Sequence, residues 1–178
     1  MSARHARQQQ KGWRNRIVGT GEEAPDQLLA NPANWRIHPK PQQDALGDAL
    51  DDIGWIQQVV VNRQSGHLID GHLRVSLAMR NNEPTVPALY VDLDDREEAL
   101  ALATLDPIAA MAAADKQKLD DLLREVDTGS AALQAMLSQL GADAGIVPDF
   151  QPVGIEEQGR LDQKKPVTCP ACGHEFTT

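Results

Sequence analysis

The sequence predicts an α/β (α+β) protein: a small mixed sheet with packed helices, followed by a helical hairpin and a short cysteine knuckle. Two observations lead to this prediction. Short β-branched or apolar runs alternate with segments of helical periodicity along residues 26–141. Aromatic residues make up only 3% of the 178 residues, against 41% for all apolar types, so the core must consist mainly of Leu, Ile, Val and Ala. This length allows one domain with appendages rather than two large domains.

The first part of the chain is a basic arm followed by a turn-rich segment and a helix. Residues 1–25 are rich in Gln, Arg and Gly, and we expect a flexible basic arm there. The prolines within residues 31–39 exclude a helix from that segment, whereas Pro41 opens one that ends at Gly54. One face of this helix is apolar and consists of Ala45, Leu46, Ala49, Leu50 and Ile53.

Three short strands and two helices complete the predicted domain. Residues 59–61 are all Val and predict a buried strand, and residues 67–70 predict a second strand after a Gly-containing turn. Gly71 begins a helix, and residues 86–92 predict a third strand. Residues 97–105 are apolar on most faces, which favours a largely buried helix.

We place the boundaries of this domain at residues 26–110. Two amphipathic segments follow, with Asp115 and Ser130 as expected N-caps, and together they predict a helical hairpin at 111–141. Periodicity is then lost, and Gly, Pro and Gln become frequent. The remaining parts are a linker at 142–166 and a knuckle-like tail at 167–178.

Charge is distributed unevenly along the chain. The net charge is −9, yet the first 20 residues contain five cationic side chains and no acidic one. An acidic protein can still bind nucleic acid through a local basic surface. The predicted DNA-binding residues are therefore Arg4, Arg7, Lys11, Arg14 and Arg16. No apolar run is long enough to span a bilayer and no signal-peptide pattern is present, so we expect a cytoplasmic protein without a membrane partner.

Three motifs carry a resemblance to a known family. They are Asn31-Pro32, the segment 53–61 (Ile-Gly-Trp-Ile-Gln-Gln-Val-Val-Val) and the segment 69–78 (Ile-Asp-Gly-His-Leu-Arg-Val-Ser-Leu-Ala). Together they resemble the ParB/sulfiredoxin-like family (the ParB N-terminal domain) over about residues 28–127. The motifs Asn-Trp-Arg-Ile-His-Pro (34–39) and Asp-Gly-His-Leu-Arg (70–74) are similar to those of a phage or prophage branch of the family, whose members are often found beside, or fused to, DNA methyltransferases. The resemblance implies the fold class described above and an association with DNA or nucleotides.

The Gly-His-Leu-Arg turn is the candidate phosphate site, with Gly71, His72 and Arg74 as binding residues. A glycine at a strand-to-helix junction lets a ligand approach the backbone, the free N–H groups of the first turn favour an anion, and Arg can bind a phosphate bidentately. The alternative is structural: a helix-entry glycine, with Arg74 in a salt bridge to Asp70. In the family this junction binds nucleotide phosphates and commonly reads Gly-Glu-Arg-Arg, which makes a nucleotide with Mg²⁺ the expected cofactor.

A second family motif, Glu-Asn-x-x-Arg, helps hold the triphosphate and its metal. The corresponding residues 103–107 read Ala-Thr-Leu-Asp-Pro, so the Glu, Asn and Arg are all absent. The sequence therefore lacks the residues of a CTP switch of the chromosome-partitioning kind. The catalytic cysteine of sulfiredoxin falls at about His72, which excludes that reductase activity.

Catalytic candidates also lie at this turn. Asp70 and His72 are the candidate acid and base of a metal-dependent enzyme, and His38 and His67 could gather near them. No spacing links the histidines, so scattered surface histidines are the simpler interpretation. The acidic run 92–98 is interpreted as a solvated helix start that suits the helix dipole.

The C-terminal motif Cys-Pro-Ala-Cys-Gly-His is typical of a zinc-ribbon knuckle. Cys169 and Cys172 can bind one Zn²⁺, and His174 is the candidate third ligand. A fourth ligand could come from water, from His5 or from another chain, and the last case implies a homodimer. The alternative is a degenerate half-ribbon without metal.

Three functions remain open from the sequence. The first is a DNA-associated accessory protein of phage or prophage type, which binds DNA or nucleotide phosphate and serves DNA modification or metabolism. The second is a metal-dependent nuclease or nucleotide hydrolase on the same fold. The third is an adaptor that docks a DNA methyltransferase or terminase through its hairpin and knuckle.

Overall fold

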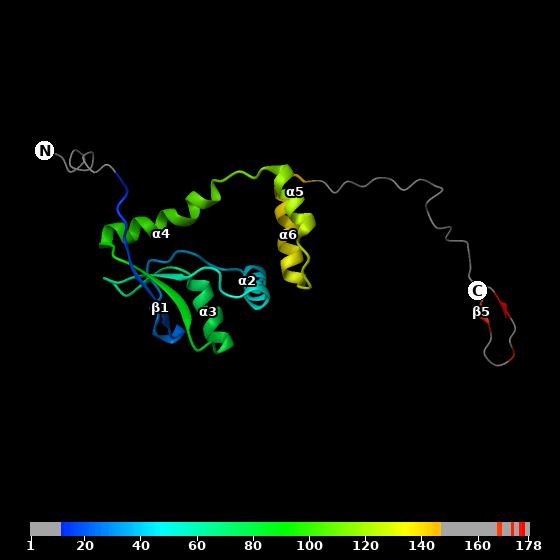
Figure 1. Ribbon diagram of the computed structural model, residues 1–178, viewed down its shortest axis with the longest axis horizontal. Helices are drawn as coiled ribbons and strands as arrows, with labels where there is room; N and C mark the ends of the chain where they lie inside the picture. The colour runs from blue at the N-terminus through cyan, green and yellow to red at the C-terminus, as the bar shows by residue number, and fades with distance from the viewer. Residues whose placement is uncertain (1–11, 147–166, 169–171, 173–174, 177–178) are drawn as a thin grey trace. The chain divides into compact units, whose positions relative to one another are not determined.

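The computed structural model describes residues 12–146, 167–168, 172 and 175–176 (Figure 1). The chain divides into two compact units, Met1–Ile146 and Val147–Thr178. In the second unit, the described residues form an antiparallel pair of two-residue strands, β5 (Val167–Thr168) and β6 (Glu175–Phe176). The first unit contains the sheet and the helices.

The sheet of the first unit has four strands in the order β1-β4-β2-β3. The strands are β1 (Ile17–Glu23), β2 (Val59–Asn62), β3 (Leu68–Asp70) and β4 (Val86–Val91). β2 runs parallel to β4, whereas the β1–β4 and β2–β3 pairs are antiparallel. The sheet is thus mixed, which confirms the predicted fold class.

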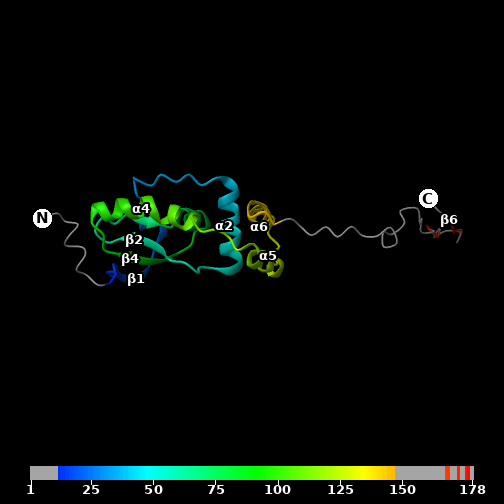
Figure 2. The same cartoon turned by 90° about the horizontal axis from the view of Figure 1, so that it is seen from above.

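Helices lie on both sides of this sheet (Figures 1 and 2). They are the 3₁₀ turn η2 (Pro25–Gln27), α2 (Lys40–Ile53), α3 (His72–Asn81), α4 (Asp95–Ala110), α5 (Lys116–Glu125) and α6 (Ala131–Asp143). In the view of Figure 1, α4 lies above the strands and α3 below them. The hairpin of α5 and α6 lies beside α2, where the Ser130 hydroxyl donates a hydrogen bond to Asp48.

The core lies between the sheet and α3 and is aliphatic, as the composition predicts. Its buried members are Val59, Val61, Leu68, Val75, Ala78, Val86 and Ala88. Trp55 and Tyr90 pack against this cluster from its margin. The sequence also predicts the helix termini well: Asp115 and Ser130 cap their helices by accepting from the N–H groups of Lys118 and Leu133.

The N-terminal segment differs from the prediction of a flexible arm over residues 1–25. Residues 17–23 form β1, which pairs with β4 from Ile17 to Glu23, with one irregularity in the register between Ile17 and Gly19. Glycines favour a flexible backbone, but Gly21 lies against the Tyr90 ring, where an added Cβ would be 3.5 Å from a ring carbon. The strand is specified by a partner far away in sequence, which local periodicity does not reveal.

The predicted linker at 142–166 is only partly testable. Asp143 belongs to α6, and the residues from 147 to 166 lie outside the described part of the chain. Within the described ranges, no helix combines the length and the apolar character that crossing a membrane requires.

Candidate anion-binding site

Gly71 joins β3 to α3 in a conformation that only glycine adopts easily. Its φ is +94°, in the left-handed region, and a Cβ built on it would lie 2.6 Å from Val59 Cγ1 and 3.1 Å from Val59 Cα. Both the backbone angle and the contact with β2 therefore require glycine here. The same close packing fixes where the first turn of α3, with its free N–H groups, begins.

A cavity of about 200 Å³ opens at this first turn. Four segments supply its walls: the chain before α2, α2 itself, the β3–α3 junction and the C-terminal half of α4. The lining residues are Arg36, His38, Gln42, Leu46, Asp70, Gly71, His72, Leu73, Arg74 and Asp106. The predicted site residues Asp70, Gly71, His72 and Arg74 thus share one cavity.

Arg74 is held in place by neighbours on two sides. Its Nη1 lies 3.4 Å from Asp70 Oδ2, and its Nη2 donates to the Gln57 side chain. The side chain is only 16% exposed. The structural alternative, a salt bridge between Arg74 and Asp70, is therefore present, and it also orients the guanidinium group beside the cavity.

Arg36 is a second cation in the cavity, which the sequence analysis missed. Its Nε lies 2.5 Å from Asp106 Oδ2 and its Nη1 3.8 Å from Asp70 Oδ1. Its guanidinium carbon lies 5.7 Å from the centre of the Trp35 ring, within reach of a cation–π contact. Nη2 is buried and has no hydrogen-bond partner among the described residues. The only sequence signal for this role is an Arg placed between Trp35 and the prolines that follow.

His72 contributes a neutral ring with one free nitrogen. The backbone N–H of Asn31 donates to Nε2 at 3.2 Å, while Nδ1 is buried and has no partner within the described ranges. Burial lowers the pKa of His72, and the positive charge of Arg36 and the proximity of His38 lower it further, against an opposing effect of Asp70. Because Nε2 accepts a hydrogen bond, the proton of the neutral ring is assigned to Nδ1, which makes that atom a donor.

Of the three histidines His38, His67 and His72, only two line the cavity. His38 and His72 line the cavity, but His67 lies with its Nδ1 3.7 Å from Glu98 Oε1. Asp70, the candidate acid, pairs with two arginines, Arg36 and Arg74. Within the part of the chain that the structure describes, no group of three His, Cys, Asp or Glu side chains is placed to hold a metal ion.

Glu98 corrects the interpretation of residues 92–98 as a solvated run. It is 9% exposed, and its carboxylate accepts hydrogen bonds from Asn31 at 2.6 Å, Asn62 at 2.5 Å and Ser65 at 2.6 Å. Burial alone would raise the pKa of Glu98, but these hydrogen bonds outweigh it and lower the pKa. Helical periodicity turns this carboxylate inward although its sequence neighbours face solvent.

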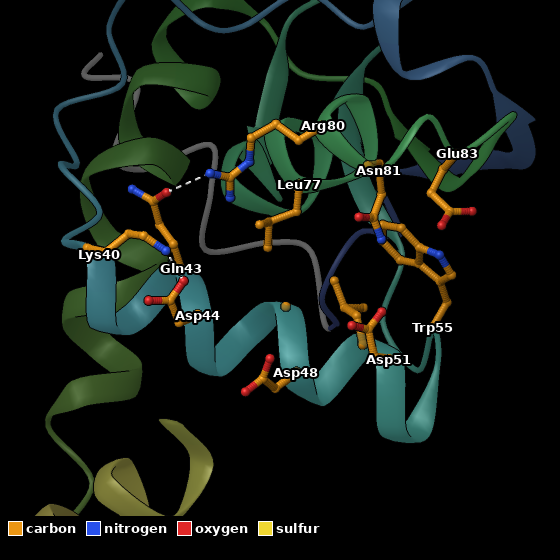
Figure 3. Close-up of a pocket in the computed structure, with 13 residues that line it drawn as sticks. Lys40, Gln43, Asp44, Asp48, Asp51, Trp55, Leu77, Arg80, Asn81 and Glu83 are labelled. Atoms are coloured by element: carbon orange, nitrogen blue, oxygen red, sulfur yellow. Dashed lines mark hydrogen bonds and ion pairs between the residues drawn. The ribbon is translucent and has the colours of Figure 1, made fainter. Parts of the chain in front are cut away.

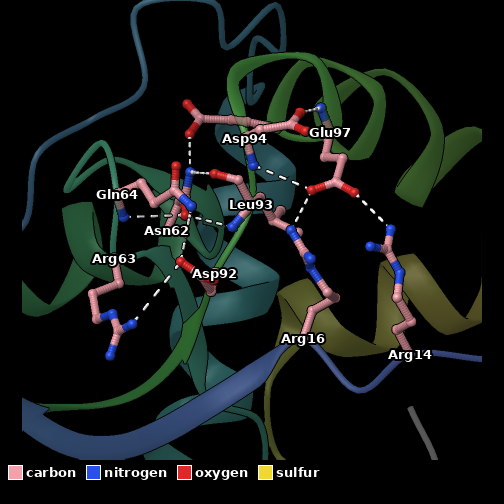
Figure 4. Close-up of polar contacts among 10 residues, drawn as sticks. Arg14, Arg16, Asn62, Arg63, Gln64, Asp92, Leu93, Asp94 and Glu97 are labelled. Atoms are coloured by element: carbon pink, nitrogen blue, oxygen red, sulfur yellow. Dashed lines mark hydrogen bonds and ion pairs between the residues drawn. The ribbon is translucent and has the colours of Figure 1, made fainter.

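Two other acidic residues of this run, Asp94 and Glu97, organise the start of α4, and Glu97 also pairs with two residues of the predicted basic arm, whose role in DNA binding stays a prediction (Figure 4). Asp94 and Glu97 form a capping box at the start of α4. Glu97 also binds two predicted DNA-binding residues: Arg14 Nη2 lies 3.0 Å from Oε1, and Arg16 pairs with Oε2. Both arginines are therefore occupied within the domain. The other three residues of the predicted basic arm, Arg4, Arg7 and Lys11, lie outside the described residues.

The predicted zinc ligands belong to the second unit. Cys172 is a free, exposed cysteine between β5 and β6. Cys169 and His174 lie outside the described residues, so the prediction of a zinc site remains a prediction.

A larger cavity, of about 290 Å³, lies between α2 and α3 (Figure 3). Asp44, Asp48, Asp51 and Glu83 line it together with only two cations, Lys40 and Arg80. The cations have partners at its edge, because Lys40 pairs with Asp44 and Arg80 donates to Gln43 at 3.1 Å. Its acidic character disfavours an anion, so the smaller cavity is the candidate anion-binding site.

Comparisons with known proteins give structural matches alone. No protein-family model matches the chain, and no curated protein matches it. The chain is similar to the C-terminally truncated chromosome-partitioning protein ParB from Caulobacter crescentus complexed with CTP-γ-S. That match has a TM-score of 0.49 and 18% identity and covers 72% of this chain and 71% of that one. It is also similar to a Pnob8-like ParB-N domain, with a TM-score of 0.45 and 16% identity, covering 92% of this chain and 59% of that one.

Proposed function

We propose that this chain is a DNA-associated accessory protein that binds phosphate groups of nucleotides or DNA in the cavity at the start of α3. One observation carries the proposal: Arg36 Nη2 and His72 Nδ1 are buried, lack hydrogen-bond partners among the described residues, and belong to residues that line the same cavity. A buried donor without an acceptor costs about 1–3 kcal/mol. Phosphate oxygens are acceptors for donors of this kind, and the first turn of α3 adds backbone donors.

The charge of the cavity limits which phosphate ligands can bind well. Two guanidinium groups, of Arg36 and Arg74, face two carboxylates, of Asp70 and Asp106, so the empty cavity is close to neutral. A bare polyphosphate would therefore meet like charge as well as cations. A nucleotide that carries Mg²⁺ brings less negative charge, and we expect it to bind more tightly than the free nucleotide.

The proposal is tested by binding of pyrophosphate and of the four ribonucleoside triphosphates, with and without Mg²⁺, to the full chain by calorimetry. Arg74→Ala removes a charge-assisted bond and should weaken binding by about tenfold to a hundredfold without unfolding the protein. Arg80→Ala is the matched control, because Arg80 lies on the same helix but lines the other cavity. Unaltered affinity together with lower stability in Arg74→Ala would show that this residue is only structural.

The DNA part of the proposal rests on the cations that precede the described residues. Deleting residues 1–11 removes Arg4, Arg7 and Lys11 but leaves β1 and the Arg14 and Arg16 ion pairs intact. We expect the slope of log affinity against log salt for duplex DNA to fall by up to about 2.7, since each phosphate contact contributes about 0.9. An unchanged slope would remove the arm from the DNA interface.

A second candidate function is the adaptor, which exposed apolar side chains on the hairpin favour. Leu122, Val126, Met136 and Leu140 are each more than 40% exposed on α5, at its end and on α6. As an adaptor, the protein would bind a DNA methyltransferase or another phage DNA-processing protein through these side chains. A second copy of this chain is a further proposed partner. Co-purification of this protein with a DNA methyltransferase that is encoded beside it would support the adaptor function, provided that Leu122→Glu abolishes the co-purification.

The knuckle is proposed to bind zinc through Cys169, Cys172 and His174, with the remaining ligand supplied by water, His5 or a second chain. Metal content of the purified chain tests this proposal, with Cys169→Ser as the variant that should lose the metal. If the monomer contains less than one zinc per chain and the dimer contains one zinc per two chains, the fourth ligand comes from a second chain.

A further inference from the structure

We propose that Glu98 is a positioning residue for the anion site: through Asn31 it holds His72 in the tautomer that offers the Nδ1 proton to an anion in the cavity. The inference rests on the proposed function, because the anion is the ligand named there. Glu98 itself does not line the cavity. Its effect must therefore pass through the residues between them.

Asn31 connects the two residues. It is 5% exposed, and its side-chain Nδ2 donates to Glu98 Oε1 at 2.6 Å while its Oδ1 accepts from the Ala33 N–H at 2.9 Å. Both ends of the amide are thus fixed, which leaves the residue little freedom to rotate. Its backbone N–H then points at His72 Nε2, at 3.2 Å.

That backbone bond determines the protonation of the ring. A backbone N–H can only donate, so His72 Nε2 must accept and cannot carry a proton. The single proton of the neutral imidazole is therefore on Nδ1, the buried atom without a partner among the described residues. If Asn31 moved away, the two tautomers would become closer in energy and the donor would be lost part of the time.

Glu98 needs both oxygens for this task. Oε1 accepts from Asn31, and Oε2 accepts from Asn62 and Ser65. A Gln at this position keeps the shape, but its NH₂ group must replace one of the two oxygens and face a donor. Its single amide oxygen keeps the place of Oε2, where two donors converge, so the NH₂ group of Glu98→Gln faces Asn31 Nδ2 and the contact with Asn31 is broken.

The alternative is that Glu98 only fastens α4 to β2 and its turn. Two readouts separate the possibilities: the tautomer of His72, from the ¹⁵N chemical shifts of its ring, and the affinity for inorganic pyrophosphate. Ser65→Ala removes one donor to Glu98 without touching the Asn31 contact. It should lower stability and leave both readouts unchanged.

The central experiment compares Glu98→Gln with Glu97→Gln in the full chain. The two substitutions are identical and adjacent, but Glu97 contacts Arg14 and Arg16 rather than Asn31. Glu98→Gln should mix the His72 tautomers and weaken pyrophosphate binding by about fivefold to tenfold, as expected for one hydrogen bond to an anion. Glu97→Gln should change neither.

A double-mutant cycle with His72→Ala tests the route. If Glu98 acts through His72, Glu98→Gln causes no further loss of pyrophosphate affinity in the His72→Ala background. If Glu98→Gln does not fold, Asn31→Ser takes its place, since Ser keeps a short oxygen for the Ala33 N–H but cannot reach Glu98.

The outcomes distinguish the inference from the proposed function. A single Nδ1–H tautomer in Glu98→Gln, or additive losses in the cycle, would overturn the positioning role while the anion site stands. Wild-type protein that shows the expected tautomer but no pyrophosphate binding would overturn the anion site, and with it the purpose proposed for Glu98.

Discussion

The cavity at the first turn of α3 and the cavity along the C-terminal part of α3 differ in size, in charge and in how their polar atoms are satisfied. The larger, of about 290 Å³, is lined by four carboxylates, and its two cations are bonded at its edge. The smaller, of about 200 Å³, has two arginines and two buried nitrogen atoms that lack partners in the described part of the chain. Volume alone would favour the larger cavity, although its acidic lining disfavours an anion. Unsatisfied buried donors are the better indicator, because each is a cost that a ligand can remove.

Gly→Ala substitutions in the two cavities should change the free energy of unfolding in opposite directions, and this is the largest expected effect. Gly71→Ala forces a Cβ to within 2.6 Å of Val59 at a φ of +94°, and should lower the free energy of unfolding by about 3 kcal/mol or more. Gly47→Ala in α2 meets nothing closer than Leu77 at 4.0 Å and should stabilise the helix by about 0.5–1 kcal/mol. Urea unfolding measures both, and equal signs would contradict the packing described here.

Carboxylates in the two cavities should differ in their effect on anion binding. Asp106→Asn removes a negative charge that lies against Arg36, and should strengthen pyrophosphate binding by about threefold to tenfold, a modest gain because Asp106 is half exposed. Asp51→Asn in the larger cavity should leave the affinity unchanged. Stronger binding in Asp51→Asn than in Asp106→Asn would move the anion site to the larger cavity.

His72, in the smaller cavity, and Glu98, which contacts it through Asn31, should make the free energy of unfolding fall at acidic pH. His72 has a lowered pKa when folded, so the unfolded chain takes up its proton first, and stability should fall as the pH drops below 6.5. The pKa of Glu98 is also lowered, so its contribution is present above 4.5 and is lost as the pH falls through the lower folded value. Urea unfolding between pH 7.5 and 4 checks this. A wild-type profile retained in His72→Ala above pH 5 would argue against the His72 assignment.

The smallest expected effect lies at the outer wall of the larger cavity. The Ser130 hydroxyl caps α6 by accepting from the Leu133 N–H, and it donates to Asp48. Ser130→Ala should lower the free energy of unfolding by about 1 kcal/mol and leave pyrophosphate affinity unchanged. A matched loss of affinity would mean that the hairpin and the anion site are coupled.

Local signals predicted much of the fold and part of the site. The Val run of β2, the caps Asp115 and Ser130, and the glycine that opens α3 are each specified by nearby sequence, and all are present. The Arg74–Asp70 pair, which the sequence offers as the structural alternative to an anion site, is also present, between the last residue of β3 and the first turn of α3.

What the sequence concealed depends on distant partners. β1 is a strand only because β4 offers a free edge, and Glu98 is buried only because Asn31, Asn62 and Ser65 surround it. Arg36, in the segment before α2, joins the site through Asp106, which lies in α4. Such contacts bring together residues far apart in the chain, and no local pattern encodes them.

The place of β1 in the sheet has a consequence for biosynthesis. Ile17 pairs with Val91, about 70 residues later, so β1 leaves the ribosome well before its partner exists. At about 5–20 residues per second, this strand waits about 4–15 s without its hydrogen bonds. During that time Ile17 and Val18 belong to a nascent segment with a free strand edge, the kind of surface that chaperones cover and that neighbouring chains can pair with.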